Sequence, residues 1–265
     1  MRLGALWLSI GILAAGFVVG CRRQPAGDSP SASTPRVGQA ASREEAVAEL
    51  QRASVFVKLE QDGPDRKVTE VDFRSAPVGD DGLRTLRLFP ELMFVGLLGC
   101  PVTDAGMEHL RPLTGLEILV LGGTRVTDTG LAVVAELPKL RRLEFQSTAV
   151  TDAGLAHLVK LNQLGYVKAG GTRITDAGME HLAKVPTLEY LNLVQTGVGD
   201  AGLAYLARLP ALKALYLDGN RVTDAGLGHL KAAGALEVLS VRGTKVTADG
   251  VRSLQEARPK LQVSR

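Results

Sequence analysis

One short phrase recurs through most of this chain at a fixed interval. It contains a Val or Ile, then an Asp, then a Gly followed by a hydrophobic residue. The phrase begins at Val78, Val102, Val126, Val150, Ile174, Val198, Val222 and Val246, and the interval between successive starts never changes. So regular a recurrence predicts a solenoid, because so short a unit buries its apolar side chains only by stacking on its neighbours.

Each unit has two halves that differ in the spacing of their apolar residues. One half reads Leu-x-x-Leu-x-Leu, as in LEILVL at 116–121 and LEYLNL at 188–193, and its alternation predicts a short strand with one buried face. The other half contains the Asp-Ala-Gly phrase and spaces apolar residues three apart, which predicts a short helical or 3₁₀ segment. The end of that segment is marked by Pro90, Pro138, Pro186 and Pro210.

This pattern resembles leucine-rich repeat proteins, in the ribonuclease-inhibitor-like style found in F-box-associated repeats and in bacterial leucine-rich repeat lipoproteins. The resemblance covers roughly residues 68–263. It implies an α/β fold, a right-handed horseshoe solenoid of about eight 24-residue repeats with a concave parallel sheet and short convex helices. For function it implies little, since the family binds many unrelated partners.

The first residues differ in composition from the repeats. Residues 1–20 hold Arg2 and then an apolar run, which predicts an export signal. The run ends in VVGC, which resembles the bacterial lipobox, and by that resemblance Cys21 carries a lipid anchor. The alternative is an uncleaved N-terminal membrane helix. Residues 21–41 are rich in Ser, Pro, Ala and Gly, so we expect the lipidated Cys followed by a flexible linker.

Residues 42–66 are expected to cap the first repeat, and residues 67–265 to form the repeat domain. SREEAVAELQRA has the capping-box spacing of Ser42 and Glu45 with a helical apolar stripe, and SVFVKLE at 54–60 is typical of a strand. At the other end the leucine register slips by one, to Leu261, which predicts a frayed and weakly capped terminus.

No catalytic, cofactor-binding or metal-binding arrangement is evident. His109, His157, His181 and His229 share one register position, which Tyr, Val, Thr or Ser occupies in other repeats, so we expect them to point outward without required chemistry. A chance metal contact between His157 and His181, or an enzyme that uses the Asp and His of the phrase, is the alternative. The net charge is only +3 and no dense Lys/Arg run is present, so a nucleic-acid partner is not expected.

Two further positions of the repeat are expected to be structural. Each repeated Asp should accept hydrogen bonds from backbone amides at the start of its helical segment. Two residues before the Val stands a Thr in most repeats, where the commonest leucine-rich repeats have Asn. A Thr hydroxyl can donate one hydrogen bond, whereas the side-chain amide of Asn can satisfy groups on both sides. We therefore expect Thr to hold neighbouring repeats together less strongly than Asn would. Cys100 takes this position in one repeat and is expected to be a buried thiol.

The outward side chains of the predicted strands do not repeat, and we call this surface the strand face. Its apolar members, expected to form an exposed patch, are Phe94, Leu98, Ile118 and Val120. Its polar and aromatic members are Arg142, Glu144, Tyr166, Lys168, Tyr190, Asn192, Tyr216 and Asp218. Exposed apolar clusters and Tyr beside Arg are typical of binding surfaces. The alternative is that the cap or loops cover the apolar patch.

Together these features predict a monomeric, non-catalytic module that binds a protein or peptide on the strand face. The anchor at Cys21 would hold it to a membrane of the cell envelope, on the periplasmic or the surface side. A cell-wall polysaccharide is the alternative ligand, suggested by the same tyrosines beside Lys168, Asn192 and Asp218.

Overall fold

The computed structural model describes residues 37–60 and 67–265. The predicted export signal, Cys21 and most of the linker therefore lie outside the described residues. Within the described ranges, no helix is long and apolar enough to cross a membrane.

One sheet runs through the whole described domain, and its ten strands follow one another in chain order. The strands are β1 (Phe56–Glu60), β2 (Lys67–Asp72), β3 (Phe94–Gly96), β4 (Ile118–Val120), β5 (Arg142–Glu144), β6 (Tyr166–Lys168), β7 (Tyr190–Asn192), β8 (Ala214–Tyr216), β9 (Val238–Ser240) and β10 (Gln262–Ser264). β1 is antiparallel to β2, and the other neighbours are parallel. Parallel partners such as Leu119 and Leu143 lie one repeat apart in the chain, so the sequence repeat is also the register of the sheet.

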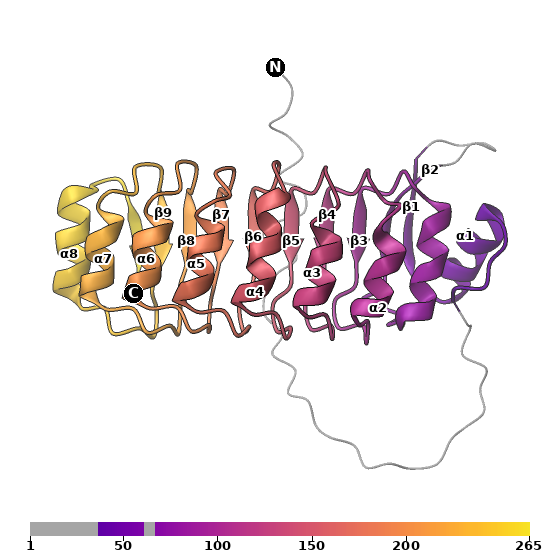
Figure 1. Ribbon diagram of the computed structural model, residues 1–265, viewed down its shortest axis with the longest axis horizontal. Coiled ribbons are helices and arrows are strands. Elements are labelled where there is room, and N and C mark those ends of the chain that lie inside the picture. Colours follow the sequence, from indigo (N-terminus) through magenta and orange to yellow (C-terminus); the bar gives the residue numbers. More distant parts are fainter. Residues whose placement is uncertain (1–36, 61–66) are drawn as a thin grey trace, which may run out of the picture. The chain divides into compact units, whose positions relative to one another are not determined.

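Short helical segments form one layer against one side of this sheet (Figure 1). They are α1 (Arg43–Arg52), η1 (Asp80–Leu88), α2 (Asp104–Met107), η2 (Glu108–Leu110), α3 (Asp128–Val134), α4 (Asp152–Leu155), η3 (Ala156–Lys160), α5 (Asp176–Leu182), α6 (Asp200–Leu206), α7 (Asp224–Leu230) and α8 (Ala248–Ala257), where η marks a 3₁₀ helix. Strand and helical segment alternate as the two apolar spacings predict, so the α/β solenoid is confirmed.

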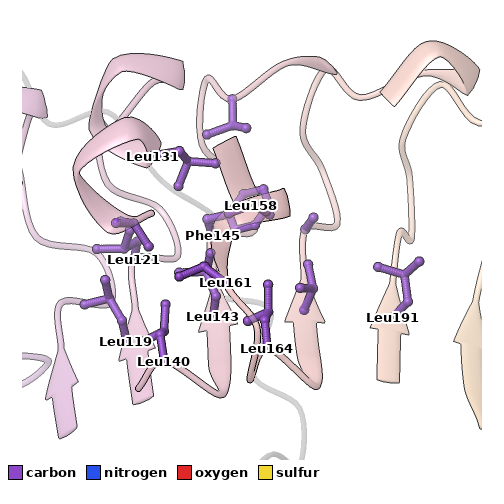
Figure 2. Packing of buried hydrophobic residues seen from close by; sticks show 14 of the residues in the cluster. Leu119, Leu121, Leu131, Leu140, Leu143, Phe145, Leu158, Leu161, Leu164 and Leu191 are labelled. Carbon is purple, nitrogen blue, oxygen red and sulfur yellow. The ribbon is translucent and has the colours of Figure 1, made fainter. Parts of the chain in front are cut away.

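The hydrophobic core lies between the strands and the helical layer. The central residue of each short strand points into it, and Leu143, Val167 and Leu191 are 0% exposed. Leucines of the helical half, such as Leu158 and Leu161, meet them from the other side (Figure 2). Since each repeat covers its neighbour, the core is continuous along the solenoid.

The expected N-terminal helix and strand are both present. Ser42 caps α1 by accepting a hydrogen bond from the Glu45 amide (3.2 Å), and the Glu45 carboxylate accepts one from the Ala41 amide (3.0 Å). α1 packs against β1 and η1, with Ala46 and Leu50 fully buried, and so contacts the first repeat.

The prediction of a frayed C-terminal end was wrong. β10 pairs with β9, and side chains satisfy carbonyls that a following repeat would otherwise satisfy. Arg265 Nε donates to the Val246 carbonyl (2.8 Å), which corresponds to the Val222 carbonyl bonded by the Lys245 amide one repeat earlier. The Arg258 guanidinium donates to the carbonyls of Gly234 (2.9 Å) and Leu236 (3.0 Å). Long side chains that reach backbone in this way leave no spacing signal in a sequence.

Candidate functional site

The repeated Asp joins neighbouring repeats, and the expectation that it caps its own helical segment was wrong. The cap is the preceding Thr: Thr151 Oγ1 accepts a bond from the Ala153 amide (3.3 Å). The Asp152 carboxylate instead accepts from Thr175 of the next repeat, through its amide (2.7 Å) and its hydroxyl (2.6 Å). The same pair of bonds is made by Asp80, Asp104, Asp128, Asp200 and Asp224. These carboxylates therefore serve structure.

The Gly of the phrase is required by the Asp of the preceding repeat. A Cβ atom built on Gly178 would lie 2.4 Å from Asp152 Oδ1, which is closer than any real contact of this kind. A Cβ at Gly154 or Gly226 would meet the corresponding Asp at 2.4 and 2.3 Å. The Asp of one repeat and the Thr and Gly of the next thus form one contact between the two repeats, which we call the joint.

The Thr position behaves as expected from its hydrogen-bonding capacity. Thr124 Oγ1 donates to the Leu121 carbonyl (2.7 Å) of its own repeat. Asn220, at the same position, donates to Leu217 of its own repeat (3.0 Å) and to Leu193 of the preceding one (2.6 Å). Asn220 therefore reaches the preceding repeat through its own donor, whereas Thr124 donates within its own repeat. Thr196 crosses to the next repeat by donating to Asn220 Oδ1 (2.9 Å), and the weaker pinning by Thr stays a prediction.

Cys100 is a fully buried free thiol, as expected. Its Sγ lies 3.9 Å from the Phe73 carbonyl oxygen, and burial raises the pKa of the thiol. This position holds neither a nucleophile nor an exposed redox centre.

The histidines are less exposed than expected. His229 is exposed, but His109, His157 and His181 are half-buried. His109 Nδ1 is buried without a hydrogen-bond partner, and burial lowers the pKa of this imidazole. Over residues 37–60 and 67–265, no group of three or more His, Cys, Asp or Glu side chains is placed to hold a metal ion.

The strand register places the predicted binding residues in neighbouring rows on the strand face. Arg142, Tyr166 and Tyr190 lie side by side on β5, β6 and β7. The next row consists of Glu144, Lys168, Asn192 and Tyr216 on β5–β8. These rows flank the buried central residues, so their side chains lie on the side of the sheet opposite to the helical layer.

The aromatic side chains of these rows are stacked on one another. The Tyr166 and Tyr190 rings are 4.0 Å apart and nearly parallel (5°), and the Tyr190 and Tyr216 rings are 5.1 Å apart and tilted by 38°. The Arg142 guanidinium lies 4.1 Å from the centre of the Tyr166 ring. We call Arg142, Tyr166, Tyr190 and Tyr216 the tyrosine stack. Mutual contact and the cation–π geometry hold these side chains in place.

At the Arg142 end of the tyrosine stack, the charged side chains form ion pairs with one another. Glu144 is 7% exposed and accepts bonds from Arg142 Nε (2.7 Å) and Nη2 (2.5 Å), with Lys168 Nζ at 3.9 Å. Burial raises the pKa of the Tyr166 phenol, which therefore stays protonated. The phenol of Tyr216 has a raised pKa for the same reason. The stack thus offers neutral hydroxyls and ring edges.

At the far end of the tyrosine stack, polar side chains are held by hydrogen bonds. Asp218 Oδ1 accepts from Ser240 Oγ (2.5 Å) and from the Arg242 amide (2.8 Å), and Asn192 Oδ1 accepts from the Val194 amide (3.1 Å). Both side chains therefore have fixed orientations beside Tyr216.

The apolar residues lie on β3, just after it at Leu98, and on β4, next to the tyrosine stack. Leu98 is 41% exposed, while Phe94, Ile118 and Val120 are half-buried. The sequence prediction missed Phe56 of β1, which is 56% exposed and pairs with Asp72. Phe56 shares the strand face because Lys58, two residues on, forms an ion pair with Glu70 on that side. The alternation in SVFVKLE was the signal that could have found it.

Parallel strands spaced one repeat apart, leucines in the core and a helical segment in each repeat define a leucine-rich repeat protein. The family model described as Leucine Rich repeat matches residues 186–207. Among solved structures, the chain is similar to two internalins of Listeria monocytogenes. No curated protein matches the sequence.

The two internalins share the fold of the repeat domain. The internalin inlF is 21% identical with a TM-score of 0.52, and the match covers 68% of this chain and 56% of that one. Internalin C2 is 22% identical with a TM-score of 0.58, covering 71% of this chain and 77% of that one. The chain thus matches little more than half of the inlF structure, and at these identities the likeness shows the fold alone.

Proposed function

We propose that this protein is a non-catalytic binding module that presents the strand face to a protein or peptide partner. The observation that carries the proposal is the tyrosine stack. Three of the four tyrosines in the chain lie in it, on three consecutive repeats, at positions that the core does not need. Tyr and Arg are the side chains most often found to dominate binding energy at interfaces.

The order within the stack favours tight binding. Side chains that are already fixed lose little conformational entropy when a partner covers them. The Arg142 charge is already paired with Glu144, so a partner that excludes water leaves no isolated charge at this position. From Phe94 on β3 to Tyr216 on β8 the surface spans five strand intervals, or about 24 Å, which suits a folded partner or an extended peptide.

The stack also distinguishes a protein partner from a polysaccharide. A sugar ring binds an aromatic side chain by lying flat on an open ring face. Arg142 and Tyr190 lie on the two sides of Tyr166, because the three residues occupy consecutive strands. With both faces covered, Tyr166 offers a partner its edge and hydroxyl, which favours protein contacts over a sugar platform.

Replacing Tyr166, Tyr190 and Tyr216 together by Ala is expected to weaken capture of the partner by at least about 30-fold, because each change removes contact area at the proposed centre of binding energy. The measurement is quantitative pull-down from envelope extracts, followed by titration of the purified partner. The matched control is Tyr205→Ala, since Tyr205 lies on α6 in the helical layer.

Equal capture by the triple variant and by the Tyr205→Ala protein would contradict the assignment of the strand face. Both variants must first give the melting curve of a folded solenoid. A glycan array serves as the second arm: specific retention of a polysaccharide that the triple variant loses would replace the protein partner by a glycan.

We further propose that a lipid on Cys21 holds the module at the cell envelope. The support is the apolar run of residues 1–20 and the VVGC sequence that ends at Cys21. Cys21→Ser is expected to abolish incorporation of a labelled fatty acid and to release the protein from the membrane fraction. Cys100→Ser is the control, because that thiol is buried; unchanged labelling of Cys21→Ser would refute acylation at this residue.

A further inference from the structure

A row of unpaired basic side chains follows the loops that lead from the strands into the helical segments. One position of the repeat, directly after the Thr or Asn position, is occupied by Arg125, Arg173, Arg221 and Lys245. All four side chains are exposed, and none forms an ion pair with any residue that the structure describes. Arg142 of the strand face, by contrast, forms an ion pair with Glu144. We call these loops the loop rim.

Backbone hydrogen bonds between repeats space this row regularly. The amides of Arg125, Arg173 and Lys245 each donate to a Val carbonyl of the preceding repeat, at 2.8, 3.2 and 3.0 Å. Their Cα positions therefore follow the period of the sheet. The cations at 125, 173 and 221 stand two repeats apart, or about 9.6 Å, and the cation at 245 follows after one repeat.

The neighbours of these cations are small. The adjoining exposed positions of the rim carry Gly99, Gly123, Ser147, Gly171, Gln195, Gly219 and Gly243, and, at the second helical residue, Ala105, Thr129, Ala153, Ala177, Ala201 and Ala225. Exposed acids enter this set at Asp81, which pairs with Arg84 (3.0 Å), and at Asp249, which pairs with Arg252 (2.9 Å). A flat surface could therefore approach the rim closely and would meet Arg and Lys side chains first.

The repeated carboxylates lie near this edge and reduce its positive potential. They are half-buried, and their oxygens already accept bonds from the next repeat, as Asp152 does from Thr175. The Arg and Lys side chains are exposed, whereas these carboxylates are only half-exposed. The charge that an approaching surface encounters first is therefore positive, and it is screened by salt over about 8 Å.

The N-terminal segment enters the domain at this same edge. A Cβ built on Gly38 would lie 2.3 Å from the Asp81 carbonyl oxygen, so the chain passes directly against the start of η1. Asp81 occupies in the first repeat the position that Ala105 and Thr129 occupy in the next two. Gly38 therefore lies at the loop rim of the first repeat, two repeats before Arg125 and the row of cations.

We propose that the loop rim rests on the anionic phospholipid headgroups of the membrane to which the Cys21 lipid attaches the protein. This proposal builds on the proposed lipid anchor. The part of the predicted linker that precedes the described domain, residues 22–36, would reach about 21 Å as a flexible chain, which keeps the rim close to the bilayer surface. Each cation held near an anionic surface raises the bound population about fivefold. In this orientation the strand face stands upright on the membrane, open to a partner from the side.

The test uses the full chain purified from the membrane fraction and added to vesicles of phosphatidylcholine, with or without phosphatidylglycerol, that also carry a nitroxide-labelled lipid. A fluorophore is placed on the rim through Ala149→Cys, or on the loop before β6 through Gln163→Cys; both sites are exposed, and Cys100 is buried. We expect strong quenching at 149 in phosphatidylglycerol vesicles, weak quenching at 163, and loss of the effect at high salt.

Two charge-matched variants separate the rim from general electrostatics. The variant Arg125→Gln, Arg173→Gln, Arg221→Gln, Lys245→Gln is expected to lower the quenched-to-unquenched ratio at 149 by at least about tenfold. The variant Lys139→Gln, Lys160→Gln, Lys231→Gln, Lys260→Gln removes the same charge from other exposed sites and should leave the ratio unchanged. Equal quenching at 149 and 163, or equal loss in both variants, would overturn the proposal.

Flotation of the vesicles distinguishes the two proposals. A chain that fails to float with pure phosphatidylcholine refutes the lipid anchor. If that chain still floats with phosphatidylglycerol vesicles and is quenched at 149, the rim is supported without the anchor. A chain that floats with both vesicles but is never quenched at 149 keeps its anchor and refutes the rim.

Discussion

Leu191→Asp is expected to unfold the repeats around β7. Leu191 is 0% exposed and lies between Val167 on β6 and Leu215 on β8, so its side chain is part of the contact between three repeats. Losing a buried leucine costs about 2–5 kcal/mol, and forcing a carboxyl group into the same space adds several kcal/mol more. A domain with a total stability of about 5–15 kcal/mol cannot absorb that loss without local unfolding.

Hydrogen exchange and thermal melting both report this change. Because each repeat is stabilised by its two neighbours, amide protection should disappear first in β6, β7 and β8, while β3 and β4 keep more of theirs. The melting temperature should fall by well over about 10 °C, since about 1 kcal/mol corresponds to about 2–4 °C in a domain of this size.

His157→Ala is the control for this experiment. The imidazole is half-buried on η3 and makes no hydrogen bond within the described residues, so its removal should change the free energy of unfolding by no more than about 0.5 kcal/mol. Similar melting curves for the two variants would contradict the division of the repeat into core and surface positions.

The period of the sequence determined most of the fold in advance. Once the phrase is seen to recur at a constant interval, residues one repeat apart must pair between strands, and Tyr166 must lie beside Tyr190. The rows of the strand face could therefore be written down from the sequence. The ring stacking and the Arg142 contact could not, because they depend on side-chain rotamers that alternation does not specify.

The aspartates show where interpreting one repeat at a time fails. Within its own repeat, Asp152 precedes a helical segment and looks like a cap. The amide that it binds belongs to Thr175 of the next repeat, and only stacking brings the two together. The cap itself is the adjacent Thr151. The N-cap rule therefore predicted the right interaction, a side-chain oxygen that accepts from a backbone amide, but it assigned the wrong amide to Asp152.

The loop rim was overlooked for a related reason. A search for dense Lys/Arg runs does not detect cations that stand one or two whole repeats apart in the sequence. In the solenoid these residues become neighbours along one edge, at spacings of about 5–10 Å. In a repeat protein, charged residues therefore have to be compared at the same position of successive repeats as well as along the chain.

Gly178→Ala is expected to destabilise the protein by about 2–3 kcal/mol, although Ala is normally the better helix former. The added Cβ would lie 2.4 Å from Asp152 Oδ1, so the carboxylate must move and lose its bonds to Thr175, or the two repeats must separate. The control is Gly228→Ala on α7, where nothing lies within 4 Å of the built Cβ; there the same change should stabilise by up to about 1 kcal/mol.

A double-mutant cycle with Asp152→Ala identifies the joint as the cause. Asp152→Ala alone should cost about 1–3 kcal/mol, because the Thr175 amide loses its partner. In that background Gly178→Ala meets no carboxylate, only the movable end of Leu155, and should be neutral or stabilising. The two effects, measured by urea unfolding, should therefore deviate from additivity by about 2 kcal/mol or more. Simple additivity would mean that the Gly is required for some reason other than the Asp of the preceding repeat.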